Sequence, residues 1–77
     1  MYSEKLMRAL KSLRADLANE AGVPLYVIFS NATLADMCRR LPRTPEEFLE
    51  VSGVGRAKQQ KYAERFLKVI AQYAEEA

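Results

Sequence analysis

The chain has 77 residues, of which 49% are hydrophobic and 29% charged, and its formal net charge is +2. It suffices for one domain with a small core, and no apolar run approaches the ~20 residues of a membrane-spanning helix. Without histidine, histidine-based acid–base catalysis and histidine metal sites are excluded, and a single cysteine cannot form an internal disulfide. We therefore expect a non-catalytic domain with no cofactor or metal, made without a signal peptide and located in the reducing cytoplasm.

The first predicted element is a helix over residues 3–21. Ser3 is a suitable N-cap residue, and Gly22 suits the left-handed position that follows a helix end. Pro24 prevents the helix from continuing. Leucines recur at i, i+4, i+7 and i+11 and mark the core face: Leu6, Leu10, Leu13 and Leu17.

Residues 23–29 read Val-Pro-Leu-Tyr-Val-Ile-Phe, a composition typical of strands. No second strand-like segment follows, and a solitary strand has nowhere to place its backbone hydrogen bonds. We therefore expect an extended or single-turn linker pressed onto the core. Its buried residues are expected to be Val23, Val27, Ile28 and Phe29.

A second helix is predicted over residues 32–41, capped by Ser30 or Asn31 and ended by Pro42. Its apolar face consists of Leu34, Met37, Cys38 and Leu41. After Pro42 the sequence contains a signal for the start of another helix.

That signal is Thr44-Pro45-Glu46-Glu47, with Thr44 as N-cap, Pro45 at the first helical position and Glu47 closing a capping box. The third helix is short and is expected to stop at Val51 or Ser52.

The last helix is predicted to begin near Gly55 and to run to the end of the chain. At ~100° per residue, one face carries apolar residues and a neighbouring stripe carries cations. The apolar face is Tyr62, Phe66, Val69, Ile70 and Tyr73, and the stripe is Lys58, Lys61, Arg65 and Lys68. The predicted fold is a compact all-α bundle of four main helices plus the short linker.

Two glycines flank one valine before the last helix, where Gly53-Val54-Gly55 leads into Arg56 and Lys58. Glycine permits close approach to another molecule, and a helix N-terminus offers N–H groups and a positive dipole end to a phosphate. The pattern is typical of helix-hairpin-helix elements that hold nucleic-acid backbones. A tight turn between packed helices requires the same glycines without nucleic acid.

Three stretches carry a family resemblance. They are a leucine-periodic first helix closing with Gly22-Val23-Pro24-Leu25-Tyr26-Val27-Ile28-Phe29, then Asn31-Ala32-Thr33-Leu34, and last Val51-Ser52-Gly53-Val54-Gly55 with Lys58 and Tyr62 downstream. Together they resemble the HRDC domain (helicase and RNase D C-terminal) over nearly the whole chain. The similarity is greater to the HRDC domains of bacterial RecQ DNA helicases than to that of RNase D.

The resemblance implies that residues 1–77 are one HRDC-like domain at the C-terminus of a larger ATP-dependent helicase. Some family members bind single-stranded DNA weakly and tune which DNA structures the helicase engages, whereas others contact protein. The implied partners are single-stranded or partly unpaired DNA and the helicase core, with no membrane partner. A monomer is expected, in the bacterial cytoplasm and associated with the nucleoid through the parent helicase.

The resemblance also singles out Tyr26, because DNA-binding members use an exposed aromatic residue at the matching place. A ring on the surface can stack on an unpaired base. The structural alternative is that Tyr26 is one more buried residue of an apolar run.

The other candidate contacts are basic residues and helix starts. Arg14 would lie close to Tyr26, and a cation beside an aromatic ring suits a single strand. Ser30, Asn31 and Thr33 offer donors to a phosphate, although the same residues can simply cap a helix. The remaining candidates are Gly55, Arg56, Lys58 and Lys61.

Two rival functions stay open. Asp16 and Glu20 interrupt the basic surface of the first helix and would repel a passing strand, which favours a regulatory module that docks on the helicase core or another protein. A ribonuclease of the RNase D type would bind RNA instead.

Overall fold

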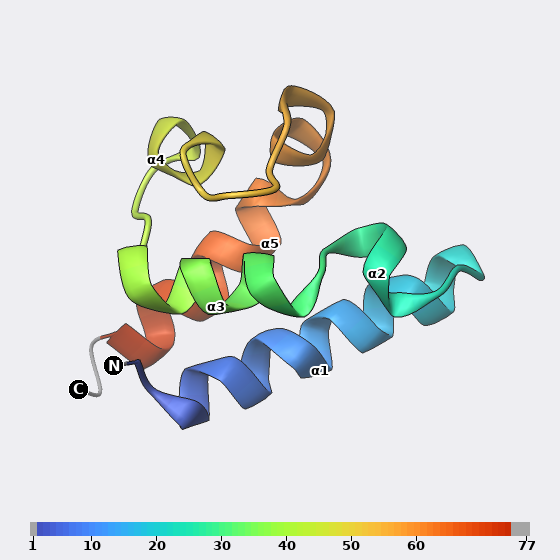
Figure 1. Ribbon diagram of the computed structural model, residues 1–77, viewed down its shortest axis with the longest axis horizontal. Coiled ribbons are helices and arrows are strands. Elements are labelled where there is room, and N and C mark those ends of the chain that lie inside the picture. Colours follow the sequence, from blue (N-terminus) through green and yellow to red (C-terminus); the bar gives the residue numbers. More distant parts are fainter. Residues whose placement is uncertain (1, 75–77) are drawn as a thin grey trace.

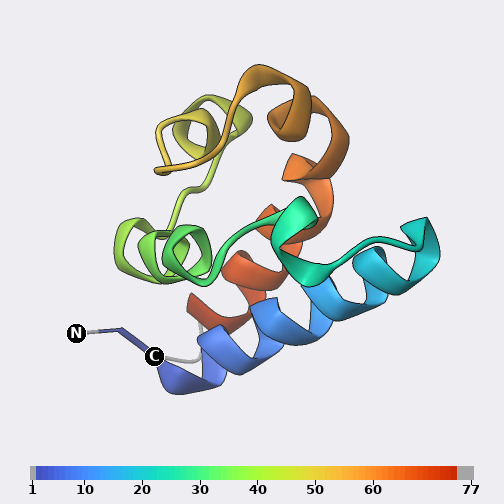
Figure 2. The ribbon, with the colours of Figure 1, turned by 45° about the vertical axis from the view of Figure 1, so that its right-hand side comes forward.

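The computed structural model describes residues 2–74, which form helices and no strand, so the all-α prediction is confirmed. The helices are α1 (Glu4–Ala21), α2 (Leu25–Ile28), α3 (Asn31–Arg40), α4 (Pro45–Leu49) and α5 (Arg56–Ala74). The long helices α1 and α5 pack on each other, α3 packs on α1, and α4 packs on α5 (Figures 1 and 2). α2 is the single turn that connects α1 to α3.

The ends of α1 are those that the sequence predicts. The Ser3 hydroxyl accepts a hydrogen bond from the Leu6 N–H at 3.2 Å. At the other end Gly22 adopts the left-handed conformation with φ 67°, which glycine reaches without the steric cost of a Cβ.

The later boundaries differ by one to three residues. α3 begins at Asn31 with Ser30 as its N-cap and ends at Arg40, because Leu41 adopts the left-handed conformation with φ 48°. α4 ends at Leu49, where tight i to i−3 hydrogen bonds at the next two residues close the helix. Residues 75–77, to which the last helix was predicted to extend, lie outside the described residues.

The predicted capping box of α4 is half correct. The Thr44 hydroxyl accepts from the Glu47 N–H at 3.1 Å, as expected for an N-cap. The Glu47 carboxylate, however, accepts from the N–H of Arg43 at 2.8 Å, one residue earlier than the box requires. The carboxylate still satisfies a donor ahead of the helix and thereby holds the chain that enters α4.

The core draws side chains from every helix, from Phe29 between α2 and α3, and from the α4–α5 connection. Its buried apolar residues are Leu6, Leu10, Leu17, Ala18, Ile28, Phe29, Leu34, Met37, Cys38, Phe48, Val51, Val54, Ala63, Phe66 and Ile70. Phe29 lies at the centre of an aromatic cluster, with ring centroids 5.1 Å from Phe66, 5.7 Å from Tyr62 and 6.0 Å from Phe48. Such edge-to-face pairs add about 0.5–1.5 kcal/mol each beyond area burial.

The segment 23–29 is a helical turn, and its burial differs from the prediction. Ile28 and Phe29 are buried, but Val27 is 42% exposed and Val23 is only half-buried. The prediction of four buried residues was therefore wrong for Val27. A helical turn rotates ~100° per residue, so α2 can direct only one of its four residues into the core.

Candidate nucleic-acid interface

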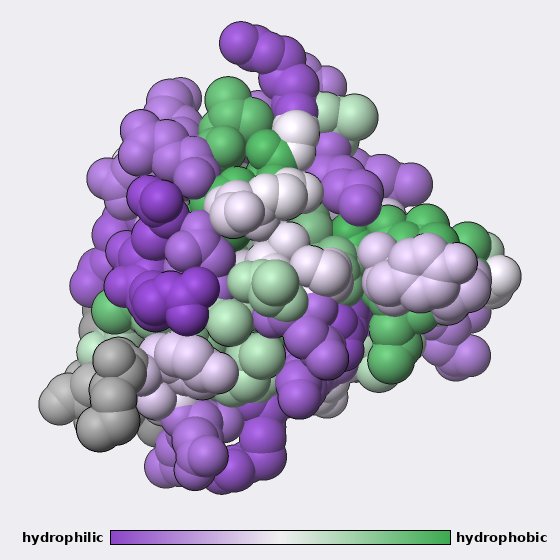
Figure 3. Space-filling model, viewed as in Figure 1, coloured by the Kyte–Doolittle hydropathy of each residue, from purple (hydrophilic) through white to green (hydrophobic). Residues whose placement is uncertain are grey.

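α2 forms an apolar ridge on the surface, and Tyr26 lies on it. Its Ile28 is buried, whereas Leu25, Tyr26 and Val27 are 46%, 72% and 42% exposed. In Figure 3 hydrophobic surface gathers at the right of the molecule, where α2 lies in Figure 1. Tyr26 therefore presents its ring to solvent, as stacking on a base requires.

A shallow groove runs beside this ridge and collects four of the candidate residues. It is lined by Arg14, Leu25, Tyr26, Ser30 and Asn31 and has a volume of about 410 Å³. No carboxylate occurs among the described residues that line it. One aromatic ring, one guanidinium and the start of α3 thus come together from three helices.

Arg14 is the buried wall of the groove rather than an exposed flank. The residue is 5% exposed, and its Nη1 donates a hydrogen bond to the Phe29 carbonyl at 2.9 Å. Its Nε is buried and has no hydrogen-bond partner among the described residues. Leaving a buried donor unpaired costs about 1–3 kcal/mol. Arg14 also has no ion pair among the described residues, so it places an unneutralised positive charge at the wall of the groove.

At the start of α3, Ser30 and Asn31 are exposed, whereas Thr33 is buried. Ser30 Oγ accepts from the Thr33 N–H at 3.1 Å and lies 3.1 Å from the Thr33 hydroxyl. Thr33 is 5% exposed, so the prediction that it contacts nucleic acid does not fit its position. Its hydroxyl lies against Gly53 of the α4–α5 connection, whereas Ser30 and Asn31 remain on the surface.

The two glycines of the α4–α5 connection have different roles. Gly53 has φ 88°, and a Cβ there would collide with the Thr33 hydroxyl oxygen. The backbone conformation and the packing of this turn therefore require glycine at position 53. Gly55 has no positive φ and lies in open space among the described residues, and its carbonyl accepts the first hydrogen bond of α5 from Gln59 at 2.9 Å.

Asp36 fixes the same connection to α3, a contact that the sequence analysis missed. Asp36 Oδ2 accepts from the Ser52 N–H and from Arg40 Nε, both at 2.8 Å. The Ser52 N–H and, secondarily, Arg40 lower the pKa of this carboxyl below its ordinary value, against the opposing effect of burial. A carboxylate four residues before an arginine was the available signal, but it indicates only the ion pair and not the bond across the fold.

The first turns of α5 place Lys58 against Phe29, the residue that follows α2, and Lys61 beside its own neighbour Tyr62. Lys58 Nζ lies 5.5 Å from the centroid of the Phe29 ring, and Lys61 Nζ lies 5.5 Å from that of Tyr62. Arg56 is exposed at the start of the helix. Because Phe29 bonds Arg14 through its carbonyl and contacts Lys58 through its ring, the groove and the start of α5 are two sides of one region.

Other charged residues are engaged elsewhere. Arg39 and Arg40 both pair with Asp36, at 3.7 Å and 2.8 Å. Farther along α5, Arg65 pairs with Glu20 of α1 at 3.8 Å. This pair neutralises one of the two acidic residues that we expected to repel a strand.

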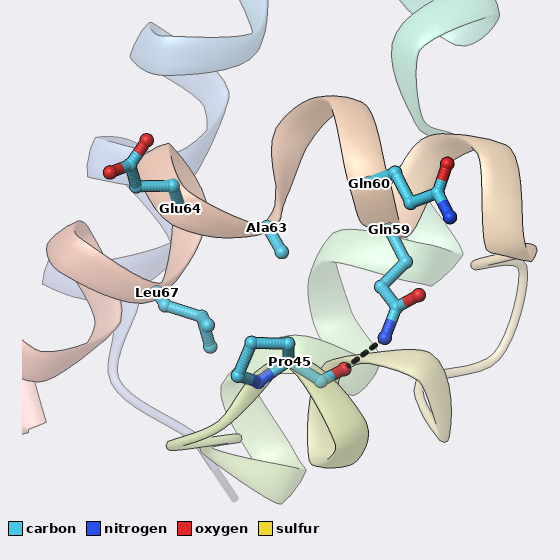
Figure 4. A pocket seen from close by; sticks show the side chains of 6 residues that line it. All are labelled: Pro45, Gln59, Gln60, Ala63, Glu64 and Leu67. Atoms are coloured by element: carbon cyan, nitrogen blue, oxygen red, sulfur yellow. Dashed lines mark hydrogen bonds between the residues drawn. The ribbon is translucent and has the colours of Figure 1, made fainter.

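A second hollow, which was not predicted from the sequence, lies between α4 and α5 (Figure 4). Gln59 Nε2 donates to the Pro45 carbonyl at 2.7 Å and ties the two helices together. The remaining lining residues are Gln60, Ala63, Glu64 and Leu67. Within residues 2–74 no three His, Cys, Asp or Glu residues group as metal ligands, and no helix has the length and apolarity to cross a membrane.

The comparisons with known proteins agree on one family. The HRDC domain model matches residues 3–70. The ATP-dependent DNA helicase Q-like 4B of Arabidopsis thaliana is 49% identical over 67 residues, which are 84% of this chain and 6% of that protein. The ATP-dependent DNA helicase RecQ of Bacillus subtilis is 39% identical over 72 residues, which are 94% of this chain and 12% of that protein.

The solved structure of D. radiodurans RecQ HRDC domain 3 is 40% identical and superposes with a TM-score of 0.86. The match covers 90% of this chain and 91% of that one, so the similarity includes the whole arrangement of helices. The chain therefore belongs to the HRDC family, the non-catalytic accessory domains of RecQ-type helicases.

Proposed function

We propose that this domain belongs to a RecQ-like, ATP-dependent DNA helicase, binds single-stranded DNA weakly, and tunes which DNA the helicase engages. The observation that carries the proposal is the ring of Tyr26, 72% exposed beside a groove whose described lining residues include Arg14 but no carboxylate. Membership of the HRDC family supports it, because the relatives reported above are DNA helicases.

In this proposal Tyr26 stacks on an unpaired base, an interaction worth about 1–3 kcal/mol. The Arg14 guanidinium and the exposed start of α3, at Ser30 and Asn31, face the neighbouring phosphate. Arg14 cannot swing outward without breaking its bond to Phe29, so it supplies a fixed charge instead of a flexible contact. One stacked base and few phosphates give weak binding.

The test is a titration of the domain into labelled single-stranded DNA, single-stranded RNA and duplex at two salt concentrations. If ~3–4 phosphates are neutralised, the logarithm of affinity falls against the logarithm of salt with a slope of about −2 to −3. Tyr26→Ala weakens binding several-fold, and Tyr26→Phe retains it. Tyr2→Ala is the matched control, because Tyr2 is 40% exposed ahead of α1, at the opposite end of that helix from α2. Equal affinity of Tyr26→Ala and wild type contradicts the proposal.

A second candidate is a module that docks on the helicase core. The observation in its favour is the ridge itself, because Leu25 and Val27 add exposed apolar surface that a phosphate backbone does not need. In that case Leu25→Ala and Val27→Ala weaken binding of the domain to the remainder of the helicase and leave DNA affinity unchanged. Absence of DNA binding below millimolar concentration also favours this candidate.

A further inference from the structure

Two cations near α2 contact different parts of one residue, Phe29. Arg14 Nη1 bonds the Phe29 carbonyl at 2.9 Å, and Lys58 Nζ lies 5.5 Å from the Phe29 ring centroid. Figures 1 and 2 show α2 between the second half of α1 and the first turns of α5. A ligand that touches both cations must therefore pass over or beside the ridge of α2.

The ridge has two exposed flanks. Leu25 and Tyr26 line the groove on the Arg14 side, whereas Val27 is 42% exposed and is not among its lining residues. Successive helical residues point ~100° apart, which turns Val27 away from the groove. An apolar surface thus continues from the groove over the top of α2 towards its other flank.

The cations at the start of α5 are unfavourable for the helix that carries them. Arg56 and Lys58 lie in its first turn, where the positive end of the helix dipole repels cations by about 0.3–1 kcal/mol each. Lys58 is nevertheless held half-buried against Phe29, and Lys61 follows one turn later beside Tyr62. An anionic partner would offset this repulsion.

The basic stripe of α5 is interrupted after these two turns by an ion pair to α1. Arg65 pairs with Glu20 at 3.8 Å, and Lys68 lies beyond that pair. The uncompensated part of the stripe next to α2 is therefore Lys58 and Lys61, without an ion pair among the described residues. The Arg65–Glu20 pair therefore limits the part of α5 that a bound anionic strand can follow.

We propose that a single DNA strand crosses α2, with a phosphate near Arg14 on one flank and the next phosphates at Lys58 and Lys61 on the other. The bases lie over Tyr26 and Val27. This inference rests on the proposed function and specifies its ligand as an internal stretch of strand instead of a nucleotide or a strand end. The crossing needs one phosphate for each of the three cations, and a strand without terminal phosphates supplies three phosphates in about four nucleotides.

The test compares two thymidine oligonucleotides, dT3 and dT12, in titrations against the domain. The double variant Lys58→Gln/Lys61→Gln removes two phosphate contacts, so its salt slope with dT12 becomes shallower by about 1.4. Its affinity for dT12 falls at least about threefold at low salt, and its affinity for dT3 does not change. Lys68→Gln, which removes the same kind of charge from the same helix, keeps the wild-type affinity, and its slope changes by clearly less than the ~0.7 expected for the loss of one phosphate contact.

Two results overturn this path. One is a double variant that binds dT12 as wild type does, and the other is a loss in Lys68→Gln equal to the loss per removed charge in the double variant, which would indicate general attraction to the stripe. If Tyr26→Ala still weakens dT12 binding in either case, the groove remains the binding site and only the crossing fails. If wild type binds neither oligonucleotide, the proposed function fails together with the path. Melting temperatures of all variants verify that they fold.

Discussion

Tyr26 and Phe29 are aromatic residues three positions apart in one segment, with opposite environments. Phe29 is 1% exposed and packs edge-to-face with three rings, whereas Tyr26 is 72% exposed at the edge of the groove. A single helical turn separates them, because it directs neighbouring side chains to different sides. We therefore expect that substitutions in this segment can change stability and the proposed DNA recognition independently, and the following variants test this division.

The largest effect is expected from Phe29→Ala. It removes the centre of the aromatic cluster and should lower the free energy of unfolding by about 3–5 kcal/mol. Urea denaturation followed by circular dichroism measures the loss. Phe29→Leu keeps most of the apolar volume and should lose clearly less, which keeps the comparison measurable if the alanine variant does not fold. A urea midpoint for Phe29→Ala equal to that of wild type would mean that Phe29 does not stabilise the core.

The second-largest effect is expected from Gly53→Ala. It should lower the free energy of unfolding by about 1–3 kcal/mol, because alanine strains the backbone at this positive φ and its Cβ collides with Thr33. Gly55→Ala is the matched control in the same connection. Gly55 has no positive φ and has open space around it, so the expected change is below about 1 kcal/mol. Equal losses in the same urea experiment would show that the contact with Thr33 is unimportant.

Asp36→Asn tests the bond that holds the α4–α5 connection to α3. The pKa of Asp36 is lowered in the folded protein, chiefly by the Ser52 N–H, so its charge stabilises the fold above the ordinary pKa and that contribution is lost as pH falls through the folded value. The asparagine variant should lose about 1–2 kcal/mol at pH 7, because its hydrogen bonds are no longer charge-assisted.

The pH dependence is the specific readout for Asp36. Urea midpoints measured from pH 6 down to pH 2 should fall less steeply in Asp36→Asn than in wild type, and the two should converge at the acidic end. Parallel curves would mean that Asp36 does not contribute to the acid sensitivity of the fold.

Much of the fold is predictable because its signals are local. The leucine spacing of the first helix, Ser3 and Gly22 at its ends, and Thr44 before α4 each act within a few residues. The candidate site is different. Arg14 was expected close to Tyr26, but the common contact of Arg14 and Lys58 with Phe29 was not predicted, because it depends on long-range packing.

The errors have the same origin. Arg14 occupies a helix position that resembles a solvent-exposed flank, and only the arrival of the Phe29 carbonyl makes it a buried donor. Val27 belongs to an apolar run that suggests burial, but a helical turn leaves it on the surface. Asp36 bonds Ser52, sixteen residues away, and sequence spacing carries no sign of that contact.

The smallest stability change is expected from Tyr26→Ala, although this substitution should have the largest effect on DNA affinity. A ring that is 72% exposed loses little burial, so the free energy of unfolding should change by less than about 0.5 kcal/mol. The same protein samples can be used for urea denaturation and for DNA titration. A loss approaching that of Phe29→Ala would mean that the ridge helps to hold α2 in place, and the separation between core and surface in this segment would no longer hold.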